Sequence, residues 1–503
     1  MESKQLRNSE EKFDAVQQGI IEEEPLSEEP KAEERRLVFK LDKRILPITC
    51  LLYLFAYLDR SNLGNARLMG LTSILGKDND PTGVLFDWVN SAFFFSYASQ
   101  TQLGLNIIVF QTPAVISSKL FPPRIWMACC TFGWGVCSTL MATGFNFGGV
   151  VVARVFLGFF EAGFGPGIPL YFSLFYTKEE MGLRMAYWFG FAAVAGAFGG
   201  LLAFGISHIT AQIENWRLLF IVEGIPTIIL SLITLLLLPN RPESTTYLTK
   251  HERELAIVRM NRGTSGDSGA MVQKKHIVMA FCDWRVYIAG VIYFGLNCSL
   301  ASISAFLPTI VTSLDYSNAT AQLFTVPPYA VAAVVLVLFS FVSDRIQSRG
   351  IPMAIASTIS AIGYLLLLVV KDNRVRYFSI FCLTSGTYTP ISLILAWFAH
   401  NLGSETKKAT GIPVLMAIGQ CGSILGSHIF PKTDGPLYIR GYAICCALAW
   451  LCVICSLILT AIPQISYRWD NAERNRLHGV PKPLSMVDTS ELADKAPNFR
   501  YAV

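Results

Sequence analysis

The sequence predicts an all-α membrane protein with twelve transmembrane helices arranged as two six-helix halves. Hydrophobic residues make up 52% of the 503 residues and charged residues only 15%, whereas soluble proteins carry about 25% charged residues. Apolar segments long enough to span a bilayer recur along the chain, and one long polar stretch divides them into two sets of six. The basic residues form no stripe, which excludes a nucleic-acid partner.

The chain begins with a polar, mostly acidic segment, residues 1–44, which lacks the apolar core of a signal peptide and is expected to be a disordered cytoplasmic tail. The first half, 45–238, has its expected spans at 45–65, 88–111, 126–143, 148–174, 185–208 and 217–238. A polar central loop, 239–283, follows. The second half, 284–463, has its spans at 284–312, 322–342, 352–370, 377–400, 410–430 and 440–463, and a cytoplasmic tail, 464–503, follows.

An even number of spans places both termini on one side of the membrane. The short loops are nearly balanced in Lys and Arg, but the segment before the first span and the central loop are rich in both. These two regions share a side, which the positive-inside rule makes cytoplasmic. The glycosylation sequon at Asn318 then lies on the other side, close to a predicted span.

Six spans, a long loop and six more spans resemble the layout of the major facilitator superfamily. That layout implies a substrate site between the halves and alternating access by rocking. The loop after the eighth span holds Asp344, Arg345 and Arg349, which resemble the acidic-basic loop of that superfamily. The resemblance implies a gating role, although the same charges can serve only to set topology. The equivalent first-half stretch, 118–124, has lost the acid.

Four charged residues inside the first half are the main candidates for a functional site. Asp59 and Arg60 lie in the first span, and Arg154 and Glu161 lie in the fourth. A charge at the bilayer centre costs about 2.5–3.5 kcal/mol, so such residues are functional candidates. Seven residues make almost two helical turns, which places Arg154 and Glu161 on one face, about 10 Å apart along the axis.

This charge pattern suits proton-coupled uptake of an organic anion. Two acids and two bases cancel, and an anion that binds an arginine would release a carboxylate for protonation. Arginine offers a planar fork to a carboxylate, and a buried Glu or Asp can carry a proton. The alternative is that Asp59, Arg60, Arg154 and Glu161 form structural ion pairs between the first and fourth spans.

Weaker polar candidates lie elsewhere in the predicted spans. Tyr97 in the second span, and Trp397 and Gln420 in the second half, are expected to contact substrate, although packing roles would also explain them. No metal-ligand cluster, no Ser/His/Asp arrangement at membrane depth and no Gly-rich phosphate loop occurs, so neither a metal, a cofactor nor an enzymatic activity is expected.

Several motifs resemble the fungal allantoate-permease-like anion:cation symporters of the major facilitator superfamily, and among them most closely the yeast high-affinity nicotinate permeases. The motifs are the stretches 59–66, 154–167, 216–224 and 438–441, with 306–313, 321–327 and 495–501 for the nicotinate group. The resemblance implies that Arg60 and Arg154 bind the anion, that Glu161 and Asp59 carry protons, and that Tyr57 faces the substrate.

The sequence therefore predicts a monomeric proton symporter for a small organic carboxylate, with nicotinate as the first substrate to test. The expected location is the plasma membrane, with the endoplasmic reticulum or the vacuolar membrane as alternatives. Allantoate, pantothenate or another vitamin or amino-acid-like anion are alternative substrates. A non-transporting nutrient sensor is the alternative from another class.

Overall fold

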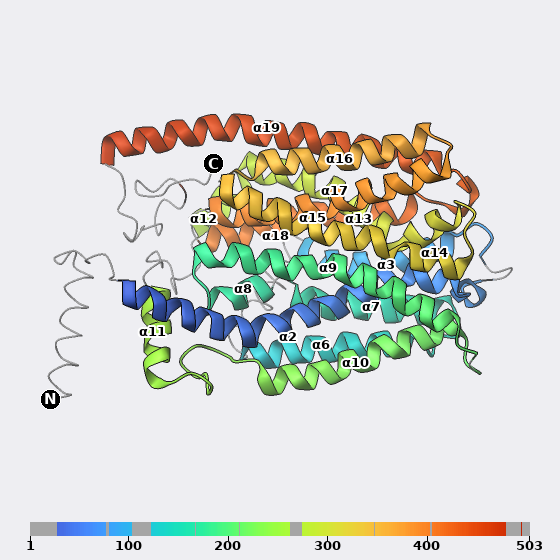
Figure 1. Ribbon diagram of the computed structural model, residues 1–503, viewed down its shortest axis with the longest axis horizontal. Helices are drawn as coiled ribbons and strands as arrows, with labels where there is room; N and C mark the ends of the chain where they lie inside the picture. The colour runs from blue at the N-terminus through green and yellow to red at the C-terminus, as the bar shows by residue number, and fades with distance from the viewer. Residues whose placement is uncertain are drawn as a thin grey trace.

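The computed structural model describes residues 28–76, 80–102, 122–165, 167–210, 212–261, 274–346, 348–402, 405–478 and Asp494. Every regular element in these residues is a helix. The helices run nearly parallel to one long axis and form an elongated bundle (Figure 1). The fold is therefore all-α, as the sequence predicts.

The first half contains α2 and α3, then α6 to α10, and a short 3₁₀ turn. Their bounds are α2 Glu28–Leu68, η1 Leu71–Ile74, α3 Val84–Gln102, α6 Pro123–Met141, α7 Phe147–Phe164, α8 Gly167–Ser173, α9 Lys178–Ser207 and α10 Asn215–Leu237. The central loop contributes α11 Lys250–Asn261 and α12 Lys274–Phe281. The second half contains α13 Trp284–Thr312, α14 Asn318–Phe324, α15 Val326–Ile346, α16 Gly350–Val369, α17 Asn373–Asn401, α18 Glu405–His428, η4 Lys432–Asp434 and α19 Ile439–His478.

Each predicted span overlaps a helix of the structure. Nine helices within the described ranges are long and apolar enough to cross a membrane by length and composition. The helices α2, α3 and α6, which overlap the first three predicted spans, are not among the nine. The total of twelve spans and the cytoplasmic placement of the termini therefore stay predictions.

Some helices extend beyond the predicted segments, and one predicted segment is divided between two helices. Residues 28–44, expected in the tail, belong to α2, where Leu37 and Leu41 are buried. Asp42, within this extension of α2, accepts hydrogen bonds from Arg184 of α9 at 2.7 and 3.0 Å. At the other end of the chain α19 continues to His478. The fourth predicted span is divided between α7 and α8, where the sequence reads Gly165-Pro166-Gly167.

Polar residues cap several helices where the chain turns back. Asn146 accepts a hydrogen bond from Gly149 N at the start of α7, Asp283 from Arg285 N at the start of α13, and Asp372 from Arg374 N at the start of α17. Side chains of this kind satisfy backbone N–H groups that a helix start leaves without partners. The caps therefore fix where the apolar segments begin.

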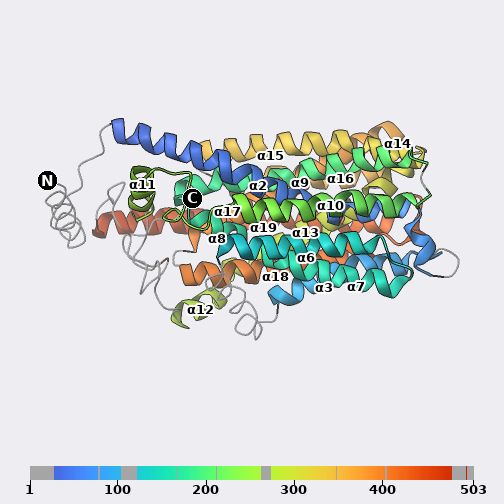
Figure 2. The same ribbon diagram turned by 90° about the horizontal axis from the view of Figure 1, so that it is seen from below.

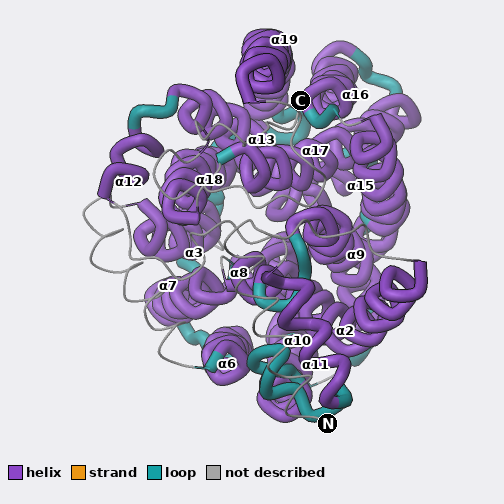
Figure 3. The backbone as a smooth tube through the Cα atoms, turned by 90° about the vertical axis from the view of Figure 1, so that its left-hand side faces the viewer, coloured by secondary structure: helices purple, strands orange, loops and turns teal. Residues whose placement is uncertain are grey.

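The helices form two groups that face each other. Viewed along the bundle, α2, α3 and α6 to α10 lie in one group, and α13 with α15 to α19 in the other (Figure 3). Contacts between the groups run mainly through α3 with α18, α9 with α15 and α2 with α13. This arrangement of two halves puts any side chain on the inner face of α2, α3, α7 or α13 close to the middle of the molecule.

The two ends of the bundle differ. The helices α11 and α12 of the central loop lie at one end, here called the linker end, together with the start of α2 and the end of α19 (Figures 1 and 2). The opposite end, here called the distal end, carries the short helix α14 (Figure 2). The start of the first described helix, α2, and the end of the last, α19, thus both lie at the linker end.

Candidate functional site

A small cavity lies between the two halves and is lined by helices from both. Three helices of the first half (α2, α3 and α7) and two of the second (α13 and α18) contribute to its wall. The lining residues are Tyr57, Arg60, Asn90, Phe93, Phe94, Arg154, Asn297, Leu300, Ala301, Ser304 and Ser423. Two guanidinium groups, several hydroxyl and amide groups and two phenylalanine rings therefore surround one space, which suits a small anion with an apolar body.

Arg60 of α2 forms an ion pair with Glu161 of α7. The Glu161 side chain is 3% exposed, and the Arg60 side chain is 16% exposed. The Arg60 guanidinium carbon also lies 5.0 Å from the ring centre of Phe93 and 4.9 Å from that of Tyr97. The aromatic rings hold the cation from one side by cation–π contact, while Glu161 supplies its counter-charge.

Arg154 of α7 is 1% exposed, yet no carboxylate forms an ion pair with it in the part of the chain described. Its Nη1 donates a hydrogen bond of 3.0 Å to the backbone carbonyl oxygen of Asp59. Its Nε and Nη2 have no acceptor among the described residues. Unpaired N–H groups of a buried guanidinium are costly. A ligand carboxylate in the cavity would satisfy them.

Asp59 is 1% exposed and accepts a hydrogen bond from Ser138 Oγ of α6, while its Oδ2 has no partner in the described chain. Asp59 is thus turned toward α6, and Arg60, the next residue, toward α3 and α7. The four charges that the sequence singles out are brought together in the core of the first half.

Tyr57 bridges the two halves beside the cavity. Its hydroxyl group lies 2.5 Å from the Tyr388 hydroxyl of α17 and 3.0 Å from Ser304 Oγ of α13. The ring centres of Tyr57 and Tyr388 are 6.0 Å apart in an edge-to-face arrangement. The family resemblance implied a role for Tyr57, whereas Tyr388 and Ser304 were not predicted, because a tyrosine or a serine in a span gives no signal without such a motif.

A third acid changes the charge count of the first half. Glu223 of α10 is 1% exposed and accepts a hydrogen bond from Asn62 Nδ2 of α2. The four charges that the sequence singles out still cancel among themselves, but with Glu223 three buried carboxyl groups share the core with Arg60 and Arg154. A charged residue inside the sixth predicted span was the signal that could have identified Glu223.

The other candidates lie at different distances from the cavity. Tyr97 contacts Arg60 through its ring. Trp397 lines a separate cavity with Asp283 and Arg285 rather than this one. Gln420 of α18 is buried but is not part of the cavity wall. Tyr97 therefore lies beside an arginine of the central cavity, whereas Trp397 lies at a different cavity.

The candidate gating residues lie at the junction of α15 and α16. Arg345 is exposed in the last turn of α15, and Arg349 is the N-cap residue of α16. The side chain of Asp344 lies outside the described part of the structure, as does most of the corresponding first-half stretch, 118–124. The gating role of this loop stays a prediction.

The two halves pack tightly at the distal end. A Cβ atom on Gly64 of α2 would overlap the backbone carbonyl oxygen of Ala305 of α13. Asn90 donates a hydrogen bond of 2.9 Å to Ser427, and His428 lies 3.2 Å from Ser91 Oγ. At the linker end, by contrast, ion pairs such as Arg184 with Asp42 run within one half. The cavity is therefore sealed on its distal side.

A two-half helical bundle with a charged central cavity is the architecture of a membrane transporter. The sequence model of the major facilitator superfamily matches residues 49–427, and the chain belongs to this family. It is therefore a multi-pass membrane transporter rather than an enzyme.

Fungal transporters are similar along most of the chain. "Major facilitator-type transporter hxnP" of Emericella nidulans is 33% identical over 93% of this chain and 93% of its own length. The "High-affinity nicotinic acid transporter" of Saccharomyces cerevisiae is 28% identical over 93% of this chain and 85% of its own length. An uncharacterized transporter of Schizosaccharomyces pombe is 31% identical over 94% of this chain and 91% of its own.

Solved structures with low sequence identity share the fold. The partially occluded inward-open xylose transporter XylE from E. coli superposes with a TM-score of 0.61 at 15% identity, covering 82% of this chain and 97% of that one. A bacterial homologue of the human lysosomal transporter Spinster, in an inward-facing and unoccupied conformation, has a TM-score of 0.60 at 14% identity, covering 82% and 95%. Both likenesses therefore show that the two-half helical fold is shared.

Proposed function

We propose that the protein is a proton symporter that carries a small organic carboxylate into the cell by alternating access. The observation that carries this proposal is the buried guanidinium of Arg154, which lines the cavity next to the Arg60–Glu161 ion pair and whose Nε and Nη2 have no acceptor among the described residues. An arginine binds a carboxylate through two parallel hydrogen bonds, which gives both affinity and orientation.

The ion pair supplies a means of coupling. A substrate carboxylate that reaches Arg60 competes with Glu161 for the same guanidinium. Once displaced, Glu161 is a buried carboxylate without a counter-charge, and burial favours its protonated form. Binding of the anion and binding of a proton therefore favour each other, and either one alone leaves an uncompensated charge between the halves.

The membrane potential makes such coupling useful. An anion that enters a negative-inside cell is opposed by about 2.3 kcal/mol per 100 mV. One proton for each monovalent anion cancels this electrical cost and adds the pH gradient as a driving force. More than one proton would also use the voltage.

Nicotinate is the first substrate we propose, because the relative from Saccharomyces cerevisiae is named as a nicotinic acid transporter. The cavity wall supports an aromatic acid, since Phe93, Phe94 and Tyr57 surround the two arginines. Allantoate, pantothenate and other vitamin or amino-acid-like anions remain alternative substrates with the same carboxylate chemistry. A non-transporting nutrient sensor would use the same cavity for binding alone.

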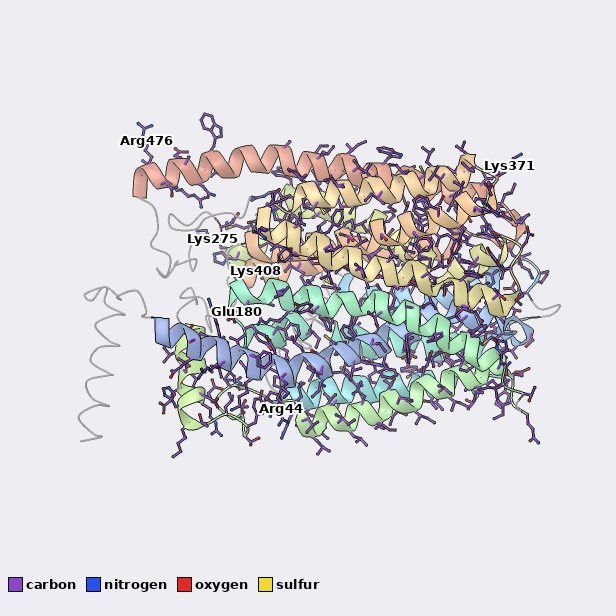
Figure 4. The ribbon with its side chains drawn as sticks, in the orientation of Figure 1. Arg44, Glu180, Lys275, Lys371, Lys408 and Arg476 are labelled. Atoms are coloured by element: carbon purple, nitrogen blue, oxygen red, sulfur yellow. The ribbon has the colours of Figure 1, made fainter. Side chains whose placement is uncertain are left out.

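We also propose a plasma-membrane location, monomeric assembly and a cytoplasmic linker end. Lys275 and Lys408 lie toward the linker end, as does Arg476 on α19, whereas Lys371 lies at the distal end (Figure 4). An excess of basic residues at the linker end supports its cytoplasmic placement by the positive-inside rule. The sealed distal end would then face outward, and the molecule would be inward-facing.

Uptake of labelled nicotinate tests the proposal. Cells that lack their own permease would express the chain and be compared at acidic and neutral external pH, with allantoate, pantothenate, biotin and cysteine as competitors. Saturable uptake that is faster in acid and is abolished by a protonophore is expected. Transport of another panel member would replace the substrate and keep the mechanism. Binding without uptake, by protein shown to be at the surface, would favour the sensor.

A further inference from the structure

Glu223 is a buried carboxyl group that takes part in no ion pair among the described residues. It lies in α10, is 1% exposed, and has no cationic partner within hydrogen-bond distance in the described chain. Asn62 Nδ2 donates to one of its oxygens, and the other, Oε2, has no hydrogen-bond partner among the described residues. A buried acid of this kind is tolerated only if it is neutral for part of the time.

The charged groups around Glu223 come from two helices. Asp59 of α2 and Arg154 of α7 are the charged side chains that interact with Glu223 electrostatically. The helix α6 faces this part of α10 with Gly135 and Thr139, neither of which titrates. The charged residues of α9 lie between Lys178 and Arg184, at its linker-end start. Arg154 is therefore the cation that Glu223 and Asp59 share.

The shared cation is also the one available to substrate. Three buried carboxyl groups, Asp59, Glu161 and Glu223, accompany two arginines in this core, so full ionisation leaves one uncompensated negative charge. When the substrate carboxylate occupies the free N–H groups of Arg154, the positive charge that stabilises ionised Glu223 is neutralised. Binding of the anion would therefore promote protonation of Glu223 as well as of Glu161.

A line of side chains connects Glu223 to the distal seal. Asn65 Nδ2 donates a hydrogen bond of 2.8 Å to Asn62 Oδ1, which belongs to the amide that also binds Glu223. The backbone carbonyl oxygen of Asn65 lies 3.5 Å from Gln322 Nε2 of α14, in the other half. Opening of the distal end separates α2 from α14, so this line would be rearranged whenever the halves rock.

From these contacts we infer that Glu223 is a second exchanging proton site of the transport cycle, loaded when Arg154 binds the substrate carboxylate and emptied when the halves rock. This inference rests on the proposed proton symport and adds to it a second proton-carrying residue and a proton-to-substrate ratio. If Glu161 and Glu223 each exchange one proton, the wild-type protein carries one proton more per anion than a chain that lacks the Glu223 carboxyl group.

The proton-to-substrate ratio tests the inference. Purified protein would be reconstituted in liposomes with labelled nicotinate, or with the panel substrate that the uptake assay identifies. The ratio would be obtained from the membrane potential at which a fixed pH and substrate gradient drives no net flux. Glu223→Gln keeps the shape and the acceptor for Asn62 but cannot titrate. Glu214→Gln, at the exposed start of the same helix, is the matched control.

We expect Glu223→Gln to carry one proton fewer per substrate than the wild type, with exchange of labelled for unlabelled substrate preserved, and Glu214→Gln to keep the wild-type ratio. Glu223→Asp, which still titrates, should keep the ratio too. A wild-type ratio in Glu223→Gln overturns the inference and leaves the symport proposal intact. Absence of gradient-driven flux in the wild type, with exchange present, overturns both.

A second variant covers the case in which Glu223→Gln does not fold. Asn62→Ala removes the amide that donates to the ionised carboxylate. If Glu223 exchanges a proton, this change favours its protonated form, and the pH dependence of transport moves toward higher pH. Asn373→Ala, which removes an amide that donates 3.1 Å to Asp315 outside the cavity wall, is the comparison. An unchanged pH profile in Asn62→Ala overturns the inference.

Discussion

Two arginines of the first half have different surroundings, and this difference assigns them different tasks. Arg60 already has a carboxylate partner in Glu161 and two aromatic rings beside it. Among the described residues, Arg154 donates a hydrogen bond only to the backbone oxygen of Asp59. The substrate must therefore displace an existing partner from Arg60 but can bind directly to Arg154, so Arg154 is expected to contribute more to affinity and Arg60 more to coupling.

Replacement of Arg154 by lysine tests its part in affinity. Lysine keeps the charge but offers no planar fork, and loss of one charge-assisted hydrogen bond, about 1.5–3 kcal/mol, corresponds to a rise in KM of roughly ten- to a hundredfold. The measurement is the concentration dependence of substrate uptake. Arg217→Lys, which alters an arginine bound to the Ala142 carbonyl oxygen away from the cavity, is the control. A normal KM in Arg154→Lys would assign Arg154 to helix packing.

Charged residues inside apolar spans can be identified from the sequence alone, whereas contacts between distant residues cannot. Asp59, Arg60, Arg154 and Glu161 were identified because a charge inside an apolar span needs an explanation. The same rule identifies Glu223 once every charged position of the sixth span is counted. The contact between Tyr57 and Tyr388 joins residues 331 positions apart, and no local pattern announces it.

At the scale of helices, close approach at the distal end depends on small residues. Gly64 of α2 lies against the backbone of Ala305, and Gly200 of α9 lies against Thr325 and Gln322 at the start of α15 and in α14. Both pairs join the two halves. A side chain at either glycine would have to push the halves apart, because the atoms in its way include backbone oxygens that cannot rotate aside.

Gly64→Leu is expected to prevent closure of the distal end. The halves would stay apart there, and the transport cycle would stop. A cysteine placed at Ser427, in a variant whose twelve native cysteines are replaced, would react faster with an impermeant thiol reagent applied from the distal side. Gly205→Leu in α9, where no atom lies within 4 Å of an added Cβ, is the matched control and should transport normally. Transport at the wild-type rate by Gly64→Leu would show that the two halves do not meet here during the cycle.

The central loop is joined to the first half by ion pairs of unequal burial. Arg259 of α11 is 3% exposed and donates to Glu180 at 3.1 Å and to the Phe175 carbonyl oxygen at 2.6 Å. Lys40 of α2 donates to Glu252 of the same loop helix at 2.8 Å, but its side chain is 40% exposed. Burial makes the first contact the stronger one, because solvent screens the second.

Arg259→Gln should therefore destabilise the protein more than Lys40→Gln. Loss of the buried cation leaves Glu180 and the Phe175 carbonyl oxygen without their donor, at a cost of about 3–5 kcal/mol for a buried pair, whereas an exposed pair contributes about 0–1 kcal/mol. Thermal unfolding of the purified protein in detergent measures both. Equal shifts in Tm would mean that α11 does not hold the linker end together.

The helices themselves were largely predictable, and their ends were not. Runs of apolar residues long enough to span a bilayer fixed the positions of the helices along the chain. The charged residues 28–44 indicated a tail, but they continue α2 because Asp42 and Lys40 find partners on α9 and α11. Those partners lie more than a hundred positions away, so hydropathy cannot reveal them.

At the scale of the whole molecule, the bundle has one sealed end and one central charged cavity. Rocking of the two halves about that cavity would expose the arginines to each side of the membrane in turn. The net charge of the core limits this motion, because a buried carboxylate without a counter-charge opposes closure of the two halves around it. With the substrate anion and both protons bound, the charges of the core cancel, whereas the anion without protons adds to the excess of negative charge, so the half-loaded state is the one expected not to rock.

Gradient-driven accumulation in liposomes containing Glu161→Gln is the most direct test of proton coupling through Glu161. With labelled substrate and an imposed inward proton gradient, the wild type should concentrate substrate above its equilibrium level. Glu161→Gln should accumulate substrate to a clearly lower level, because its side chain pairs with Arg60 without taking up a proton and leaves only the proton of Glu223 coupled, and it should still exchange labelled for unlabelled substrate. Accumulation by Glu161→Gln to the wild-type level would mean that Glu161 carries no coupled proton.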